Sequence, residues 1–134
     1  MADSTKQHFQ SVCPRLPVAD LRRSIDFYTT ILGFHLDVLW PEDEPAFCIL
    51  RRNGVRLAFD QSSEPDVPRS ASAGFYIEAD DVLALHEAIR QRVPVEWGPE
   101  VYHYGRREFA IRDPDRYMII FTEPTTDLPT CLEE

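Results

Sequence analysis

The sequence predicts an α+β fold made of two βαβββ modules, and three observations support this prediction. Apolar residues that alternate with period two, and apolar residues spaced three and four apart, follow one another in the order βαβββ. The same order repeats after a polar stretch over residues 61–72. Leu-Ala-Phe at 57–59 recurs as Ile-Ile-Phe at 119–121, near the end of each copy. Each copy is too small to bury one face of its sheet alone, so the two must pair, within the chain or across a dimer.

The first module is expected over residues 10–60 and begins with a strand at 12–18. Two prolines in this strand place it at an edge of the sheet. Asp20 is expected to cap a helix whose apolar face recurs every three or four residues and which ends at a glycine. The residues concerned are Leu21, Ile25, Tyr28, Leu32 and Gly33.

Three strands complete the first module, over residues 34–40, 46–52 and 55–60. Asn53-Gly54 lies between the last two strands and is typical of a two-residue hairpin turn. The polar residues 61–72 contain two prolines and are interpreted as a linker.

The second module is expected over residues 73–123, with its first strand at 75–79. Asp80 or Asp81 then caps a helix that Pro94 stops. Further strands are predicted at 95–97, 107–112 and 117–123, with a turn at Asp113-Pro114-Asp115. Residues 124–134 form an acidic tail, expected to be a loose end.

Composition limits the classes of function. The chain has 134 residues with 14 Lys and Arg against 23 Asp and Glu, a net charge of −9. Nucleic acid and anionic membranes attract positive surfaces, so this balance argues against both as partners. Three cysteines without a CxxC pair, no apolar N-terminal stretch and no long apolar run together indicate a cytoplasmic protein.

Two segments resemble the vicinal-oxygen-chelate superfamily. They are PRLPVADLRRSIDFYTTILGF at 14–34 and REFAIRDPDRYMIIFTE at 107–123, and the closest likeness is to the bleomycin-resistance branch of the glyoxalase/bleomycin-resistance proteins. The resemblance implies that the paired modules form a cupped mixed sheet around a cavity, commonly in a homodimer. The family's usual DPDG is Asp113-Pro114-Asp115-Arg116 here, so Arg116 must take the turn conformation that glycine would hold.

The resemblance also implies where a metal would be bound. Metal-using members carry His, Glu or Gln at four positions, which correspond here to Cys13, Ala58, Gly74 and Ile120. Three of these residues have no side-chain donor, and one thiol cannot hold a catalytic ion that needs about three protein ligands. The four histidines show no metal-binding spacing and are interpreted as surface or rim residues. No metal and no cofactor are therefore expected.

Residues two positions apart in a strand share a face, so these four positions predict which other side chains face the cavity. On this basis the cavity face carries three acids, three bases, and several uncharged residues. They are Asp60, Glu78, Glu108, Arg15, Arg56, Arg112, Tyr76, Ala110, Met118 and Thr122. The alternative role for these charged residues is structural, through ion pairs with each other.

Aromatic side chains near the cavity opening are the best ligand-binding candidates, because bleomycin-resistance proteins hold the flat, cationic part of the drug between rings. Trp40 and Trp97 each end a predicted strand, whereas core packing is the favoured interpretation of Phe47. The full set of predicted ligand-binding residues is Trp40, Phe47, Asp60, Tyr76, Trp97, Tyr102, Tyr104 and Glu108.

Residues 102–108 are expected to form a hinge loop with Gly105 that covers the cavity. A Tyr–His or Glu–His pair in this loop is the alternative, and it could run acid–base chemistry without a metal.

The sequence therefore favours a binding protein over an enzyme, with no catalytic residues. We expect it to sequester a bleomycin-like antibiotic, or another aromatic or cationic small molecule, in the cavity of a homodimer. Two alternatives stay open: a metal-dependent lyase, isomerase or dioxygenase of the same superfamily, and a binding module for an unrelated ligand.

Overall fold

The computed structural model describes residues 6–61 and 73–131, and in them the βαβββ order occurs twice. The predicted linker covers residues 61–72; Gln61 is the last residue of β4, and the rest of the predicted linker lies outside the described residues. The first module contains β1 (Arg15–Val18), α1 (Leu21–Thr30), β2 (His35–Trp40), β3 (Phe47–Arg52) and β4 (Val55–Gln61). The second contains β5 (Gly74–Glu78), α2 (Val82–Ile89), β6 (Trp97–Tyr102), β7 (Arg106–Arg112) and β8 (Met118–Pro124).

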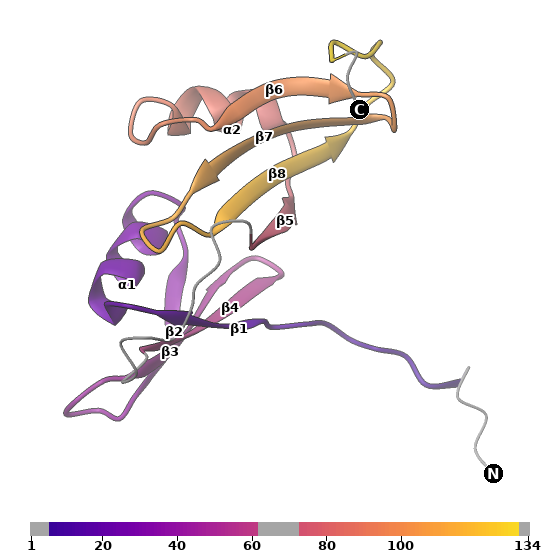
Figure 1. The fold of residues 1–134 in the computed structure, drawn as a ribbon. Coiled ribbons are helices and arrows are strands. Elements are labelled where there is room, and N and C mark those ends of the chain that lie inside the picture. The colour runs from indigo at the N-terminus through magenta and orange to yellow at the C-terminus, as the bar shows by residue number, and fades with distance from the viewer. Residues whose placement is uncertain (1–5, 62–72, 132–134) are drawn as a thin grey trace.

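Each module forms one four-stranded mixed sheet, and Figure 1 shows the two sheets with one helix beside each. The strand orders are β1-β4-β3-β2 and β5-β8-β7-β6. In both sheets the first strand of the module pairs in parallel with the last strand, and the other pairs are antiparallel. The α+β prediction and the internal repeat are both confirmed.

The predicted helix caps occur in both modules. Asp20 accepts a hydrogen bond from the backbone N–H of Arg23 at 3.2 Å, and Asp81 accepts one from Ala84 at 3.1 Å. Gly33 follows α1 with a φ of 72°, a left-handed conformation that glycine adopts without strain. The side chains of Asp20 and Asp81 thus mark where the helices begin, whereas α1 already ends at Thr30 and a turn separates it from Gly33.

One buried apolar cluster joins the two modules. It includes Tyr28 and Phe59 of the first module and Phe109 and Ile119 of the second. All of these side chains lie on the helix-covered faces of the sheets, because α1 packs on β2, β3 and β4 while α2 packs on β6, β7 and β8. Within the described residues, no helix packs on the opposite face of either sheet. We call these the open faces.

A turn of the second module is hydrogen-bonded to the first module. The carboxylate of Asp115, in the turn before β8, accepts a hydrogen bond from the backbone N–H of Ala19 at 2.9 Å, beside the start of α1. Asp113 accepts one from the hydroxyl of Tyr28 at 2.7 Å. The turn therefore fixes the docking of one module on the other.

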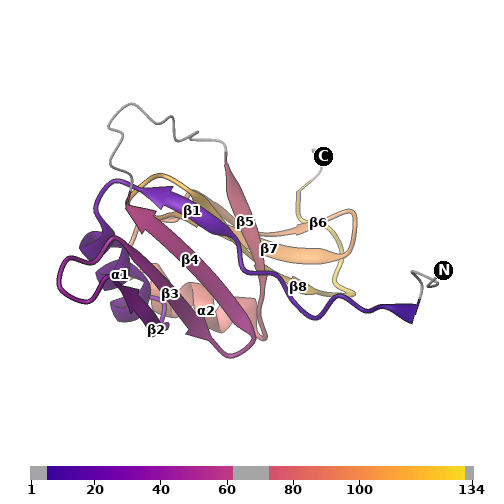
Figure 2. The same cartoon turned by 90° about the horizontal axis from the view of Figure 1, so that it is seen from below.

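The N-terminal segment is less regular than the sequence suggests. The predicted strand over 12–18 is wrong for its first three residues, because pairing with β4 begins only at Arg15. Residues 6–14 extend away from both sheets in Figures 1 and 2, and the side chains of Phe9 and Val12 are almost fully exposed.

Two predictions for the second module also need correction. The strand expected at 95–97 instead runs from Trp97 to Tyr102, because a register shift between Trp97 and Glu100 accommodates Gly98-Pro99 within the strand. Tyr102 is therefore in a strand, and only a tight turn separates it from β7. The predicted hinge loop over 102–108 is wrong.

The C-terminal tail is not a loose end over residues 125–131. Its backbone and side chains form hydrogen bonds with Val101 and Gly105. Within residues 6–61 and 73–131, no helix has the length and apolar character required to cross a membrane.

Candidate ligand-binding site

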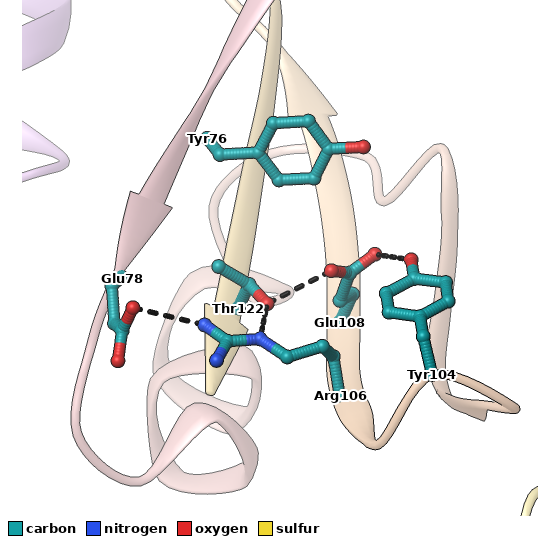
Figure 3. Close-up of a pocket in the computed structure, with 6 residues that line it drawn as sticks. All are labelled: Tyr76, Glu78, Tyr104, Arg106, Glu108 and Thr122. Carbon is teal, nitrogen blue, oxygen red and sulfur yellow. Dashed lines mark hydrogen bonds and ion pairs between the residues drawn. The ribbon is translucent and has the colours of Figure 1, made fainter. Parts of the chain in front are cut away.

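A pocket of about 460 Å³ lies on the open face of the second sheet, and Figure 3 shows the six side chains that line it. Two come from β5, two from β7, one from β8 and one from the turn before β7. They are Tyr76, Glu78, Arg106, Glu108, Thr122 and Tyr104.

Strand alternation explains why these side chains face the same way. Phe109 and Ile111 of β7 are fully buried on the helix side, so the intervening even-numbered positions point to the open face. The same alternation in β5 buries part of Ile77 and exposes Tyr76. Glu108 and Tyr76 thus lie on the same face of the sheet, as strand alternation predicted.

A continuous polar chain crosses the pocket floor. Glu108 is only 3% exposed, and its two carboxylate oxygens accept hydrogen bonds from the hydroxyls of Tyr104 and Thr122, each at 2.8 Å. The Thr122 hydroxyl accepts a hydrogen bond from Nε of Arg106 at 3.0 Å. The same guanidinium reaches Glu78 at 2.9 Å, as Figure 3 shows. Hydrogen bonds thus connect Tyr104 to Glu78 across the pocket floor, with the buried Glu108 carboxyl group in the chain.

The hydroxyls of Tyr104 and Tyr102 remain protonated at neutral pH, because the pKa of each is raised. Desolvation, followed by the hydrogen bond to Glu108, raises the pKa of Tyr104 far above its ordinary value of 10.0. Burial also raises the pKa of Tyr102, with smaller contributions from Cys131 and Glu100. The ring of Tyr104 is nevertheless 53% exposed and Tyr76 is 63% exposed, so both rings can be reached from solvent.

Three aromatic rings form a row beside the pocket. Tyr102 and Tyr104 stack with centroids 5.6 Å apart and planes 9° from parallel. Trp97 meets Tyr102 edge to face, with centroids 6.0 Å apart. The structure therefore brings together five of the predicted residues, namely Tyr76, Trp97, Tyr102, Tyr104 and Glu108. Trp97 begins its strand instead of ending it.

The other three predicted residues lie on the open face of the first sheet. Phe47 pairs with Trp40 on one side and with Asp60 on the other. The guanidinium of Arg15 lies 5.7 Å from the centre of the Phe47 ring and forms an ion pair with Asp60. The core interpretation of Phe47 is wrong, because its side chain is outside the buried cluster and only half-buried. In a single chain, this group does not line the pocket of the second sheet.

The four positions that hold metal in other family members do not fit a metal here. A Cβ added at Gly74 would lie 2.3 Å from the carbonyl oxygen of Met118, so no ligating side chain could stand there. Ala58 and Ile120 offer no donor atoms. Among residues 6–61 and 73–131, no group of three His, Cys, Asp or Glu side chains is arranged to bind a metal ion.

Comparison with known families decides the affiliation. Residues 7–121 match the Glyoxalase/Bleomycin resistance protein/Dioxygenase superfamily. The chain belongs to this superfamily. The bleomycin resistance proteins of Geobacillus stearothermophilus and Staphylococcus aureus are each 30% identical to it, over 81% of this chain and 92% of theirs. Within the superfamily, the chain therefore falls in the bleomycin-resistance-like branch.

Solved structures of the superfamily agree with this placement. The bleomycin-binding protein of the producer Streptomyces verticillus, solved with copper(II)-bleomycin, superposes with a TM-score of 0.68 at 26% identity, over 90% of this chain and 99% of that one. TnmS3, an antibiotic-binding protein from Streptomyces sp. CB03234, gives a TM-score of 0.73 at 25% identity, over 88% and 98% of the two chains.

Three residues that line the pocket were not among the predicted ligand-binding residues. Glu78 and Thr122 were placed on the cavity face but not assigned to the site. Arg106 was overlooked, although it lies two residues before Glu108 and strand alternation would have placed it on the same face. Hydrogen bonds from Arg106 link it to Thr122 and Glu78, and these bonds are visible only in the folded structure.

Proposed function

We propose that this protein sequesters a bleomycin-like antibiotic by binding it without breaking a bond. The observation that carries the proposal is the pocket in which exposed tyrosine rings flank the buried carboxylate of Glu108. Similarity to bleomycin resistance proteins over most of the chain supports bleomycin as the first ligand to test. No disulfide links Cys13, Cys48 or Cys131, which is consistent with action in the reducing cytoplasm.

The pocket offers suitable forces for a flat, cationic ligand. Stacking and cation–π attraction contribute about 0.5–2 kcal/mol for each ring. Glu78 and Glu108 outnumber the single cation Arg106 among the lining residues, so the pocket carries a net negative charge. A ligand that combines an aromatic system with a positive group would satisfy both features.

We propose further that a homodimer completes the cavity. The pocket lies on a face without a helix, and the open face of the first sheet presents Trp40, Phe47 and Asp60. In a homodimer, that face of one chain would cover the pocket of the other, so all eight predicted residues would line a shared cavity. Exposed Phe9 and Val12 on the extended N-terminal segment are further apolar surface that a second chain would bury.

Calorimetric titration with metal-free bleomycin and with copper(II)-bleomycin tests the binding function. We expect micromolar or tighter binding at one drug per chain. Glu108→Gln should weaken binding because it removes the buried negative charge while keeping the side-chain shape. Glu87→Gln is a matched control, because its ion pair with Arg90 is exposed on α2, away from both open faces. Absence of heat with either drug form at high protein concentration would contradict the proposal.

A further inference from the structure

The C-terminal residues 125–131 run back along the β6–β7 hairpin, and we call them the strap. Figure 1 shows this segment, in yellow, beside the end of β6. The backbone N–H of Thr125 donates to the carbonyl of Gly105 at 3.0 Å, and that of Thr130 donates to the carbonyl of Val101 at 2.9 Å. The strap is thus attached on both sides of Tyr102, the last residue of β6, and Tyr104 in the following turn.

Thr130 makes the most specific attachment. Its hydroxyl accepts a hydrogen bond from the backbone N–H of Val101 at 2.8 Å and donates one to Oε1 of Glu100 at 2.7 Å. β6 is the outer strand of its sheet, and Val101 is only 3% exposed. A buried N–H without an acceptor is costly, so the hydroxyl satisfies a backbone donor that the sheet edge would otherwise leave open.

Arg107 holds the middle of the strap. Its guanidinium forms an ion pair with Asp127 of the strap and reaches Glu123 of β8 at 3.5 Å. The side chain of Arg107 is only 16% exposed, so its charge is partly shielded from solvent. The strap is therefore anchored at Thr125, Asp127 and Thr130.

The strap matters for the pocket because Tyr104 lies in the turn, outside any strand. Two interactions fix its ring: the stack on Tyr102 and the hydrogen bond from its hydroxyl to Glu108. Both require the turn to stay in place against the sheet. We infer that the strap positions the Tyr102–Tyr104 stack for the ligand and that Thr130 is the positioning residue. This inference rests on the proposed binding function.

Three single variants test the inference by bleomycin titration. Thr130→Val removes the hydroxyl and keeps the side-chain shape, and we expect about tenfold weaker binding, the loss that corresponds to one hydrogen bond. Thr130→Ser keeps the hydroxyl and should bind within about twofold of the wild type. Thr29→Val is the control, since it removes a hydroxyl that donates to the backbone carbonyl of Ile25 in α1, far from the site in sequence and on the other module. It should leave the affinity unchanged.

A second measurement separates this inference from the binding function. Amide hydrogen exchange at Val101 to Gly105 should be faster in Thr130→Val than in the wild type, with wild-type protection in Thr130→Ser. This result supports the positioning role of the strap even if the wild type does not bind bleomycin. In that case only the proposed binding function is wrong. If the wild type binds and Thr130→Val binds equally well with unchanged exchange, the strap inference is wrong and the binding function stands. If Thr130→Val does not fold, Asp127→Asn, which weakens the ion pair with Arg107, takes its place with the same expected directions.

Discussion

Arg116 has a φ of 74°, in the left-handed region where a side chain is strained. The residue lies at the turn between β7 and β8, at the position where the family resemblance implies a glycine, and its side chain is exposed. The expectation that Arg116 takes the conformation of that glycine is confirmed. The backbone carbonyl of Arg116 accepts a hydrogen bond from Arg112 at 2.7 Å, which a glycine would retain.

We therefore expect Arg116→Gly to raise the free energy of unfolding by about 1 kcal/mol, because it removes the strain of the left-handed conformation. Urea denaturation followed by circular dichroism would measure the change. Asn53→Gly is the matched comparison at a φ of 54°, and its gain should be smaller because asparagine tolerates this region. A loss of stability in Arg116→Gly would show that the arginine side chain contributes more than the strain costs.

The buried carboxyl of Asp113 makes stability depend on pH. It accepts hydrogen bonds from the hydroxyl of Tyr28 and from two backbone N–H groups, yet burial raises its pKa above the ordinary 3.8. Folding then favours the protonated form. The stabilising contribution of this titration is fully present below pH 3.8 and is lost as the pH rises through the raised pKa.

Asp113→Asn removes this titration and so gives a test. The difference in unfolding free energy between the wild type and the variant should widen, in favour of the wild type, as the pH falls from 7 to 4. Urea titrations at pH 7, 5 and 4 would measure it. A difference that narrows on acidification would mean that the hydrogen bonds lower the pKa more than burial raises it.

At the scale of an element, β6 depends on Gly98. This residue has a φ of 86°, and a Cβ added there would lie 2.4 Å from the carbonyl oxygen of Glu108 in the neighbouring strand. Gly98→Ala should therefore lower the free energy of unfolding by about 2–4 kcal/mol, through backbone strain and overpacking together.

Gly54→Ala is the control for that variant, because a Cβ at Gly54 would meet no atom within 4 Å. Its effect should stay within about 1 kcal/mol. Chemical denaturation of both variants, with near-ultraviolet circular dichroism to follow Trp97 and Tyr102, would measure stability and ring packing together. Equal stability of the two alanine variants would contradict the role given to Gly98.

The elements that sequence patterns predicted are those fixed by local chemistry. Asp20 and Asp81 cap the helices, and the apolar pattern identifies six of the eight strands at nearly their observed positions, while β1 was predicted three residues too long. β6 was predicted too short because Gly-Pro is usually a strand breaker, and only pairing with β7 shows that a bulge accommodates it. The tail was misjudged for a similar reason, since its hydrogen-bond partners Gly105 and Val101 precede Thr125 and Thr130 by 20 and 29 residues.

At the scale of the whole molecule, the open faces lead to a prediction about assembly. Ile49 is a half-buried apolar residue in the middle of the first open face, paired with Val38 and Ala58. If a second chain covers this face, Ile49→Glu should convert the dimer to a monomer, because it would bury an unpaired charge. Sedimentation equilibrium at several concentrations would measure the change.

Leu83→Glu is the control for assembly, since Leu83 is 50% exposed on α2 and away from both open faces. That variant should remain dimeric. A wild-type protein that stays monomeric at every concentration would contradict the proposed dimer, whatever the variants do.

For the candidate site, too, the sequence predicted local features but not contacts between segments that are distant in the chain. Parity within a strand predicted that Tyr76 and Glu108 share a face, because side-chain alternation is a local property. It could not predict that Trp40, Phe47 and Asp60 of the first module lie apart from the pocket, because this depends on how the two modules dock. Docking is set by contacts such as that between Asp115 and Ala19, which lie 96 residues apart.

The internal repeat also bears on how such a protein can evolve. Register aligns Arg15, Phe47 and Asp60 of the first module with Tyr76, Glu108 and Thr122 of the second, so one ancestral surface now exists in two chemically different versions. The apolar cluster uses the opposite sides of the same strands, and substitutions on the open faces leave it intact. Each duplicate can therefore acquire new specificity while the other keeps its own, and neither change has to disturb the fold.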